Sequence, residues 1–273
     1  MKELKKLNKN YPNRTAFITG AGSGLGAAFA KLLAANRWTL HLVDINLDLL
    51  ENIKPELSNA VDIHIYQLDV SNKMAFEKVG EKLKRITDGL DLLINNAGIG
   101  DAELFREYKV DHWERMIRIN LLGTYYGTHY LLPFIENQKG MIINIGSAAG
   151  FMNAPGMSAY NVTKAGVFAL AETLFHELKP KGVHVSVVTP TFFKTNIMSE
   201  ASGSEQFVHF AEKQMKYSTT NADEMAQVIL EQSATGKFHI IHPKEARKAF
   251  FFKKWLPSLA AKQFGKMMEK FAK

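Results

Sequence analysis

The sequence predicts an α/β fold: a single doubly wound (Rossmann-type), mostly parallel seven-stranded sheet with helices on both faces. Short apolar runs alternate, in order, with longer segments of helical periodicity through most of the 273 residues. Several apolar runs contain almost no polar residue, which is typical of parallel strands that helices cover on both sides. A hydrophobic content of 46% is enough for one large core.

Taken in chain order, the apolar runs give the strands and the periodic segments give the helices. We expect strands at 15–19, 39–43, 61–66, 91–94, 141–145, 183–188 and 238–241. We expect helices at 24–36, 47–54, 72–86, 111–136, 158–179 and 221–233. Together they predict one domain over 15–243. Within it, the mixed composition of 191–221 predicts a lid or short helices outside the sheet.

The positive charge is concentrated at the two ends of the chain. Residues 244–273 contain nine Lys and Arg against two Asp and Glu, and the tail 1–14 contains five against one. The residues between, 15–243, carry a net charge of −4, although the whole chain carries +7. A nucleic-acid-binding protein more often carries its positive charge on the folded body, so this class is disfavoured.

Cysteine is absent, which excludes disulfides, catalytic thiols and Cys-ligated zinc. No His-rich or carboxylate cluster has the spacing of metal ligands, so no metal is expected. Residues 1–13 lack the apolar stretch of a secretory signal, and the aromatic run 250–252 is far too short to span a bilayer. We therefore expect a cytoplasmic protein, with peripheral contact at a membrane surface left open.

A glycine-rich turn, TGAGSGLG at 19–26, lies where the first strand meets the first helix. Glycines let the backbone turn tightly and approach a diphosphate, which the free N–H groups of the helix can bind. A glycine trio alone is a weak signal because some such matches are only tight turns, but the strand–turn–helix position strengthens it. The candidate dinucleotide contacts are Gly20, Ser23, Gly24, Leu25 and Gly26.

Asp44 closes the second strand, 24 residues after Gly20. A carboxylate at this place can accept hydrogen bonds from the adenosine ribose hydroxyls and would repel a 2′-phosphate. The turn contains no basic residue, and the apolar Ile45 follows Asp44. These features favour NAD over NADP as cofactor, whereas the simplest alternative is a solvated Asp at a strand end.

The segment YNVTK places Tyr160 and Lys164 four residues apart, on one face of a predicted helix. A free tyrosine has a pKa near ~10, and a neighbouring cation lowers it. Alone, such a pair is more often a surface feature. Here it lies 13 residues after Ser147, which follows the strand at 141–145.

With these motifs in register, the sequence resembles the short-chain dehydrogenases/reductases, in the subgroup with a GxxxGxG turn and a YxxxK pair. The resemblance covers about residues 12–243. It rests on TGAGSGLG at 19–26, Asp69 in LDV, NNAG at 95–98, Asn120, Ser147 and YNVTK at 160–164.

The resemblance implies a role for each of these residues. Tyr160 would exchange a proton with the substrate oxygen, and Lys164 would lower the Tyr160 pKa and bind the nicotinamide ribose. Ser147 would hold the substrate oxygen, and Asn120 would anchor a water that relays protons. Thr191 departs from the glycine that the family usually has after Pro190. The implied cofactor contacts beyond the glycine turn are Asp44, Asp69, Val70, Asn96, Ala97, Gly98, Tyr160, Lys164, Pro190 and Thr195, with Asn95 bracing the sheet.

The expected substrate cleft is apolar. Around Ser147, Tyr160 and Pro190 the sequence offers Phe151, Met152, Met157, Phe192, Phe193 and Met198. The candidate substrate contacts are Phe151, Met157 and Phe192, together with Ser147 and Tyr160. An apolar secondary alcohol or ketone fits these side chains better than a sugar or an acid, although each apolar side chain could equally belong to the core.

The sequence thus predicts an NAD(P)-dependent oxidoreductase that acts on the CH–OH group of an alcohol or on its ketone. The alternative is a catalytically silent NAD-binding sensor or scaffold. Its usual sign would be loss of Tyr160, Lys164 or Ser147, and all three are present. The resemblance also implies a homodimer or homotetramer built on the helices at 111–136 and 158–179.

The extension at 244–273 lies beyond the resemblance. Pro257 and Ser258 predict a helix start, and apolar residues then recur at helical spacing among lysines. The preceding segment, ARKAFFFKKWL, mixes aromatic and basic residues. Two interpretations stay open: the apolar stripe packs on the body or a partner subunit, or it lies on an anionic lipid surface.

Overall fold

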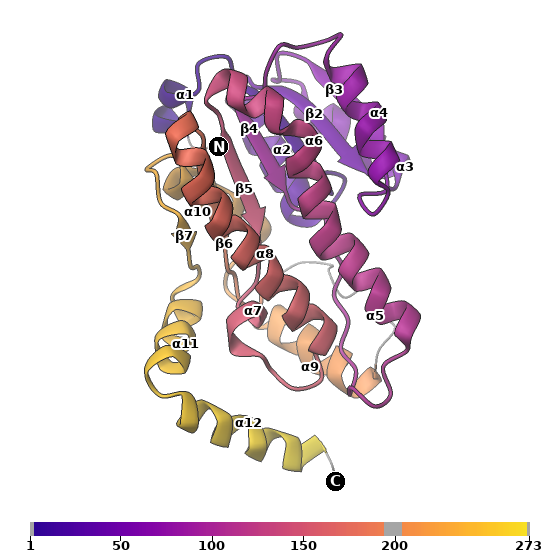
Figure 1. The fold of residues 1–273 in the computed structure, drawn as a ribbon, viewed down its shortest axis with the longest axis vertical. Helices are drawn as coiled ribbons and strands as arrows, with labels where there is room; N and C mark the ends of the chain where they lie inside the picture. Colours follow the sequence, from indigo (N-terminus) through magenta and orange to yellow (C-terminus); the bar gives the residue numbers. More distant parts are fainter. Residues whose placement is uncertain (1–2, 194–203, 272–273) are drawn as a thin grey trace.

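The computed structural model describes residues 3–193 and 204–271, and their helices and strands follow the predicted order (Figure 1). Seven strands form one sheet with the order β3-β2-β1-β4-β5-β6-β7, and every neighbouring pair is parallel. The strands are β1 (Thr15–Thr19), β2 (Thr39–Asp44), β3 (Ile63–Gln67), β4 (Leu92–Asn95), β5 (Met141–Ile145), β6 (His184–Val188) and β7 (His239–Ile240). The strand order reverses between β1 and β4, and ligands bind doubly wound sheets at the carboxyl ends of such strands.

Helices cover both faces of the sheet, and each face has its own apolar core. Because side chains alternate along a strand, Ile18 of β1 packs into one core and Phe17 into the other. The first core is completed by α1 (Lys5–Asn10), α2 (Gly24–Ala35), α3 (Leu47–Ile53) and α10 (Ala222–Ser233). The second is completed by α4 (Lys73–Leu83), α6 (Gly123–Gln138) and α8 (Ser158–Leu178).

The remaining elements are shorter or lie outside the two cores for most of their length. They are α5 (Val110–Met116), α7 (Ala149–Met152), α9 (Glu205–Lys216), α11 (Lys244–Trp255) and α12 (Pro257–Phe271), two 3₁₀ turns (Lys54–Leu57 and Lys179–Lys181) and a π-helical segment (Ile117–Leu122). In Figure 1, α11 and α12 lie at the lower end of the view, away from α1. Part of the segment expected as a lid forms α9, and residues 194–203 lie outside the described residues.

The predicted strands are confirmed with end shifts of one or two residues. Some strands start later than the apolar run, whereas β2, β3 and β4 end one residue past it, at the polar residues Asp44, Gln67 and Asn95. Both kinds of shift arise because the ladder bonds are made by the backbone and do not depend on side-chain polarity. The strand expected at 238–241 is half as long as predicted, since β7 contains only His239–Ile240. This strand lies at the edge of the sheet and pairs only with Val187 and Val188 of β6, so few backbone bonds define it.

The single helix predicted at 111–136 is wrong in one respect: α5 and α6 are joined through the π-helical segment Ile117–Leu122. A π turn holds one residue more than an α turn, and such turns are frequent at functional sites. Hydrophobic spacing does not reveal the extra residue because the apolar face continues through it.

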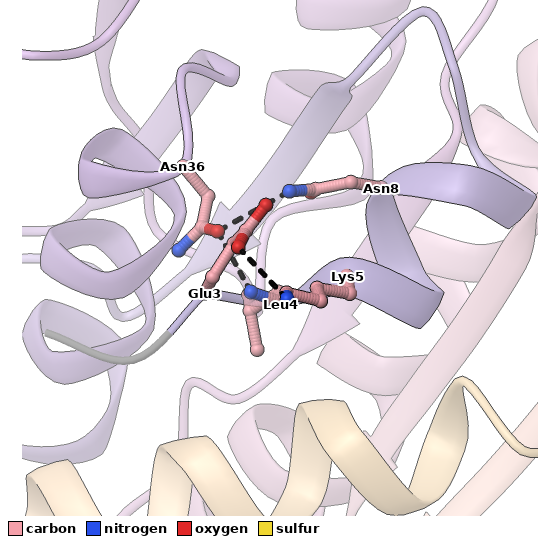
Figure 2. Close-up of polar contacts among 5 residues, drawn as sticks. All are labelled: Glu3, Leu4, Lys5, Asn8 and Asn36. Atoms are coloured by element: carbon pink, nitrogen blue, oxygen red, sulfur yellow. Dashed lines mark hydrogen bonds and ion pairs between the residues drawn. The ribbon is translucent and has the colours of Figure 1, made fainter.

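The amino-terminal segment, predicted as a basic tail, contains the helix α1. Leu4, Leu7 and Tyr11 are buried in the first core. Figure 2 shows how Asn36, at the end of α2, faces this segment. Its Oδ1 accepts hydrogen bonds from the Leu4 backbone N–H at 2.8 Å and from Asn8 Nδ2 at 3.2 Å. Lys5, Lys6 and Lys9 are exposed and therefore lie on the outer side of a docked helix.

Candidate active site

The glycine turn is held in a conformation that side chains would obstruct. Gly20 and Gly24 have φ angles of +64° and +52°, in the left-handed region that favours glycine. A Cβ on Gly20 would lie 2.9 Å from the Cα of Ala97, and a Cβ on Gly26 would overlap the Gly20 carbonyl oxygen. The turn after β1 and the loop after β4 can touch only because these positions are glycine.

Hydrogen bonds fix the same two loops to each other. Thr19 Oγ1 accepts from the backbone N–H groups of Asn96 and Ala97, both at 3.0 Å. Asn96 Nδ2 donates back to the carbonyls of Thr19 at 2.9 Å and Gly20 at 3.1 Å. Asn95 is buried and donates to Thr128 Oγ1 and Asn144 Oδ1, so it ties β4 to α6 and β5. These bonds hold the loop after β4 in place.

Asp44 faces this turn from the end of β2. Its Oδ2 accepts a hydrogen bond from the Gly22 backbone N–H at 3.0 Å, and its Oδ1 accepts from Asn46 at 3.1 Å. A Cβ on Gly22 would come within 2.6 Å of Leu49 Cβ, so a side chain at this position would prevent the turn from reaching the Asp44 carboxylate. The half-buried carboxylate is oriented by the backbone and remains next to the groove.

A cavity of about 360 Å³ runs along the carboxyl ends of the strands. It brings together most of the residues that the sequence analysis assigned to a dinucleotide. Those that line it are Gly20, Ser23, Gly24, Leu25, Asp44, Asp69, Val70, Asn96, Ala97, Gly98, Tyr160, Lys164 and Pro190. Gly26 lies beneath the turn, and Thr195 lies outside the described residues.

Tyr160 and Lys164 come from the first two turns of α8 at the end of β5, where Lys164 is buried and Tyr160 is half-buried. The side chains of Tyr160 and Ser147 share a hydrogen bond. Lys164 Nζ donates to the Ile145 carbonyl at 2.9 Å and lies 5.7 Å from the centre of the Tyr160 ring. The phenol and the ammonium therefore line one end of the cavity, and Ser147 bonds the phenol without itself lining the cavity.

Burial opposes the charged form of both α8 side chains. It raises the pKa of Tyr160, and the hydrogen bond from Ser147 partly offsets this by lowering it. Burial lowers the pKa of Lys164 to about 8, so the ammonium is still the main form at neutral pH. A positively charged Lys164 beside the phenol is the group that can stabilise a phenolate.

Asn120 sits in the π-helical segment, where its side chain turns toward the loop after β4. Its Oδ1 accepts from the Ile99 N–H at 2.8 Å, and its Nδ2 donates to the Ile99 carbonyl at 2.9 Å. A Cβ on Gly98 would lie 3.0 Å from Asn120 Oδ1 and 3.5 Å from Lys164 Nζ. Asn120, Gly98 and Lys164 therefore converge behind Tyr160.

The candidate substrate contacts are more dispersed. Phe151 packs edge-to-face on Phe250 of α11, with ring centres 5.1 Å apart, and does not line the cavity. Met157 is half-buried and forms an isolated β-bridge with Glu103. Phe192 is 36% exposed, whereas its neighbour Phe193 is buried and lines the cavity. Met198 lies outside the described residues.

The cavity also contains residues that sequence reasoning missed. They include Arg115 of α5, Ile119 of the π-helical segment and Leu68, whereas Phe193 was among the residues expected near the cleft. The sequence positions of two of these residues could have indicated that they line the cavity. Ile119 precedes Asn120 directly, and Arg115 lies four residues earlier on the same side of the helix.

Comparison with known proteins agrees with this geometry. The short chain dehydrogenase family matches residues 14–206. The chain belongs to this family. The 2-dehydro-3-deoxy-L-rhamnonate dehydrogenase (NAD(+)) of Sphingomonas sp. (strain SKA58) is 35% identical over 197 residues, which cover 71% of this chain and 78% of that protein.

Two solved structures are also similar. A short-chain dehydrogenase/reductase from Burkholderia phymatum in complex with NAD has a TM-score of 0.81 at 27% identity, covering 88% of this chain and 92% of that one. A short-chain dehydrogenase from Sphingobium yanoikuyae in complex with NADPH has a TM-score of 0.75 at 28% identity, covering 93% and 95%.

This short-chain dehydrogenase is therefore an oxidoreductase that acts on a CH–OH group and uses a nicotinamide cofactor. Two further findings hold for residues 3–193 and 204–271. No group of three or more His, Cys, Asp and Glu is placed to hold a metal ion. No helix there has the length and apolarity needed to cross a membrane.

Proposed function

We propose that this dehydrogenase interconverts an apolar secondary alcohol and its ketone, with NAD as the favoured cofactor and Ser147, Tyr160, Lys164 and Asn120 as the catalytic group. The observation that carries the proposal is the meeting of Ser147, Tyr160 and Lys164 at the end of β5. The three side chains lie beside a cavity that Asp44 lines at its other end.

Tyr160 exchanges the proton. In the oxidation direction its phenolate takes the hydroxyl proton of the substrate, and in reduction its phenol returns a proton to the carbonyl oxygen. Ser147 already bonds the Tyr160 side chain, so it can hold the same substrate oxygen and align it with the phenol. When bound, the nicotinamide accepts or supplies the hydride.

Lys164 keeps the phenolate accessible at neutral pH. Burial alone raises the Tyr160 pKa, so the charged form needs a nearby cation. Lys164 is buried, pinned by the Ile145 carbonyl and close to the ring. Asn120 holds the loop at Gly98 and Ile99 against Lys164, where a water can relay the proton away from the buried site.

The residues that line the cavity fit a dinucleotide. The turn carries no side chains at Gly20 and Gly24, so a diphosphate can approach its backbone. The amino terminus of α2 follows the turn and can bind the diphosphate through its free N–H groups. Asp44 would bind the ribose hydroxyls of the adenosine, and Asp69 and Val70 would border the adenine. Pro190 and Thr195 would meet the carboxamide at the far end.

The cofactor preference is tested by substitution at Asp44. We expect the wild type to bind NADH at least about tenfold more tightly than NADPH, because the carboxylate repels a 2′-phosphate. Asp44→Ser should reduce or reverse this ratio, and Asp48→Ser, at an exposed acid on α3, should leave it unchanged. Energy transfer from tryptophan to NADH and NADPH measures both constants. Wild-type preference for NADPH would contradict the assignment of Asp44 to the ribose.

The substrate class rests on the apolar side chains near Ser147 and Pro190. Phe193 is buried at the cavity wall, and Phe192 is exposed beside it. The relative from Sphingomonas is named for a polar sugar acid, so a screen must include polyols and sugar acids as well as apolar alcohols. Turnover confined to the polar compounds would contradict the proposal.

We infer a homodimer or homotetramer built on α6 and α8. Tyr125 on α6 and Val162 on α8 are 44% and 48% exposed, which leaves apolar surface on both long helices. Light scattering should report a mass of two or four chains. Tyr125→Glu should lower that mass, because a charge placed in an apolar interface is costly.

A further inference from the structure

The corner between α11 and α12 exposes four large apolar side chains within nine residues. Trp255 is 70% exposed, and Phe251, Leu256 and Leu259 are 49%, 47% and 51% exposed. Phe251 and Trp255 lie one turn apart on α11, so they share a face. We call these four residues the apolar corner. Single exposed apolar residues are ordinary, but a group of this kind marks an interaction surface.

The apolar corner is not the face that packs on the body. Ala246 is fully buried, and Phe250 lies edge-to-face with Phe151 at 5.1 Å and with His239 at 5.3 Å. These contacts fasten the inner side of α11 to α7 and β7. Phe251 and Trp255 are left on the outer side of a helix that is already docked.

Basic residues surround the apolar corner. Lys254 Nζ lies 5.5 Å from the centre of the Trp255 ring, and Lys253 Nζ lies 5.8 Å from that of Phe264 on α12. Lys248, Lys262 and Lys266 are exposed on the same two helices. With nine basic and two acidic residues, 244–273 is strongly positive, whereas 15–243 is net negative. The charge complements an anionic partner.

We propose that α11 and α12 form an interfacial anchor that binds the surface of an anionic phospholipid bilayer. Exposed aromatic and leucine side chains next to lysines have the composition of helices that lie in the headgroup region. Trp255 and its apolar neighbours would enter that region, and the lysines would contact lipid phosphates. A second copy of the chain is a poorer occupant, because it would bring two strongly basic surfaces together.

The anchor lies close to the active site. Phe250 contacts Phe151 of α7, and α7 begins two residues after Ser147. Membrane contact would therefore hold the carboxyl edge of the sheet near the lipid surface. This inference does not rest on the proposed substrate or cofactor, and its test uses no activity assay.

Sedimentation with vesicles tests the anchor in the full-length protein. We expect binding to vesicles of phosphatidylcholine with phosphatidylserine and weak binding to phosphatidylcholine alone. The double variant Trp255→Ser/Leu259→Ser should bind more than about tenfold more weakly, because two apolar side chains no longer leave water. Lys254→Gln and Lys262→Gln should each weaken binding roughly fivefold. Val61→Ser should change nothing, since Val61 is 63% exposed at the amino edge of the sheet.

Tryptophan fluorescence gives a second readout. Trp38 is fully buried and Trp113 is half-buried, whereas Trp255 is exposed, so a blue shift on addition of anionic vesicles reports Trp255. No binding, or equal binding to both kinds of vesicle, would overturn the proposal. So would an oligomer that Trp255→Ser dissociates in the absence of lipid, because a second copy would then cover the apolar corner.

Discussion

At the scale of single residues, burial acts on Tyr160 and Lys164 in the same sense: it disfavours the charged form of each. It raises the pKa of the phenol and lowers that of the ammonium to about 8. A phenolate and an ammonium at this place therefore stabilise each other, with support from Ser147. The Lys164 charge is lost as the pH rises through about 8, and support for the phenolate is lost with it.

Tyr160→Phe tests the proton-transfer role. The change removes one hydroxyl and leaves Ser147 bonded to the Ala149 N–H at 3.1 Å, so the local structure should persist. We expect turnover to fall by a factor of about 10² to 10⁴, with NADH affinity nearly unchanged. Tyr217→Phe, at a 73% exposed position that follows α9, is the control and should keep full turnover. Retention of turnover within tenfold in Tyr160→Phe would assign the proton to another group.

At the scale of elements, the turn between β1 and α2 depends on contact between backbones. A side chain at Gly26 would overlap the carbonyl of Gly20, and neither group can move without displacing the loop after β4. The helical glycine Gly80 has no such constraint. Gly80 in α4 has Tyr130 O as its nearest neighbour, 3.8 Å from an added Cβ.

These two glycines make a matched pair. Gly26→Ala should lower the free energy of unfolding by more than about 1 kcal/mol and abolish NADH binding. Gly80→Ala should raise the free energy of unfolding by about 0.5–1 kcal/mol through helix propensity and leave NADH binding unchanged. Urea unfolding and tryptophan fluorescence measure the two effects. Equal losses of unfolding free energy in both variants would show that helix packing, and not the turn, requires glycine at these positions.

The sequence predicted the order and type of nearly all helices and strands of the sheet domain. Parallel strands that are covered on both faces form almost continuous apolar runs, which are easy to recognise in a sequence. The π turn was missed, since an extra residue such as that near Asn120 does not interrupt an apolar face. Phe151 was assigned to a substrate cleft, but its partner Phe250 lies 99 residues away. Spacing along the chain cannot report a contact of that kind.

The packing of α1 on the core could also be predicted only in part from the sequence. Leu4, Leu7 and Tyr11 recur at intervals of three and four, which is a helical signature, but the charged residues between them hid it. Asn36, which holds the segment in place, follows α2 and is remote in sequence. The positive charge of this segment therefore did not indicate that it forms a helix packed on the core.

Leu7→Ala tests whether α1 is part of the core. Leu7 is 1% exposed, so its truncation should lower the free energy of unfolding by about 2–5 kcal/mol. Leu47→Ala, at a 37% exposed position of α3, should cost much less. Denaturant unfolding compares them. A small loss at Leu7 would mean that α1 is dispensable.

At the scale of the whole molecule, stability is tied to pH through buried histidines. His41 of β2 is fully buried, stacks on His64 with ring centres 4.7 Å apart and bonds the Tyr66 hydroxyl at 3.0 Å. Burial, followed by repulsion from His64, lowers its pKa to about 4 from the usual 6.5. His239 is lowered to about 4 as well, chiefly by burial.

A lowered histidine pKa favours the folded state above the unfolded pKa and loses that advantage as the pH falls. The contribution of His41 is complete above about pH 6.5 and is lost toward pH 4. Between pH 7 and pH 4 it should cost about 3 kcal/mol of unfolding free energy. His41→Leu should lose that much less over the same interval in urea titrations. An identical pH dependence in both proteins would contradict this account.

The π-helical segment Ile117–Leu122 makes the chain intolerant of a length change at one place. Removing any single residue there would let α5 and α6 join as one regular α-helix, which is the easier structure to form locally. The register of one helix would then rotate by about 100° relative to the other. Asn120 or its replacement would leave Ile99, so the loop beside Lys164 would lose both backbone bonds at once. A one-residue deletion would thus leave a regular helix but remove the hydrogen bonds that join it to the active-site loop.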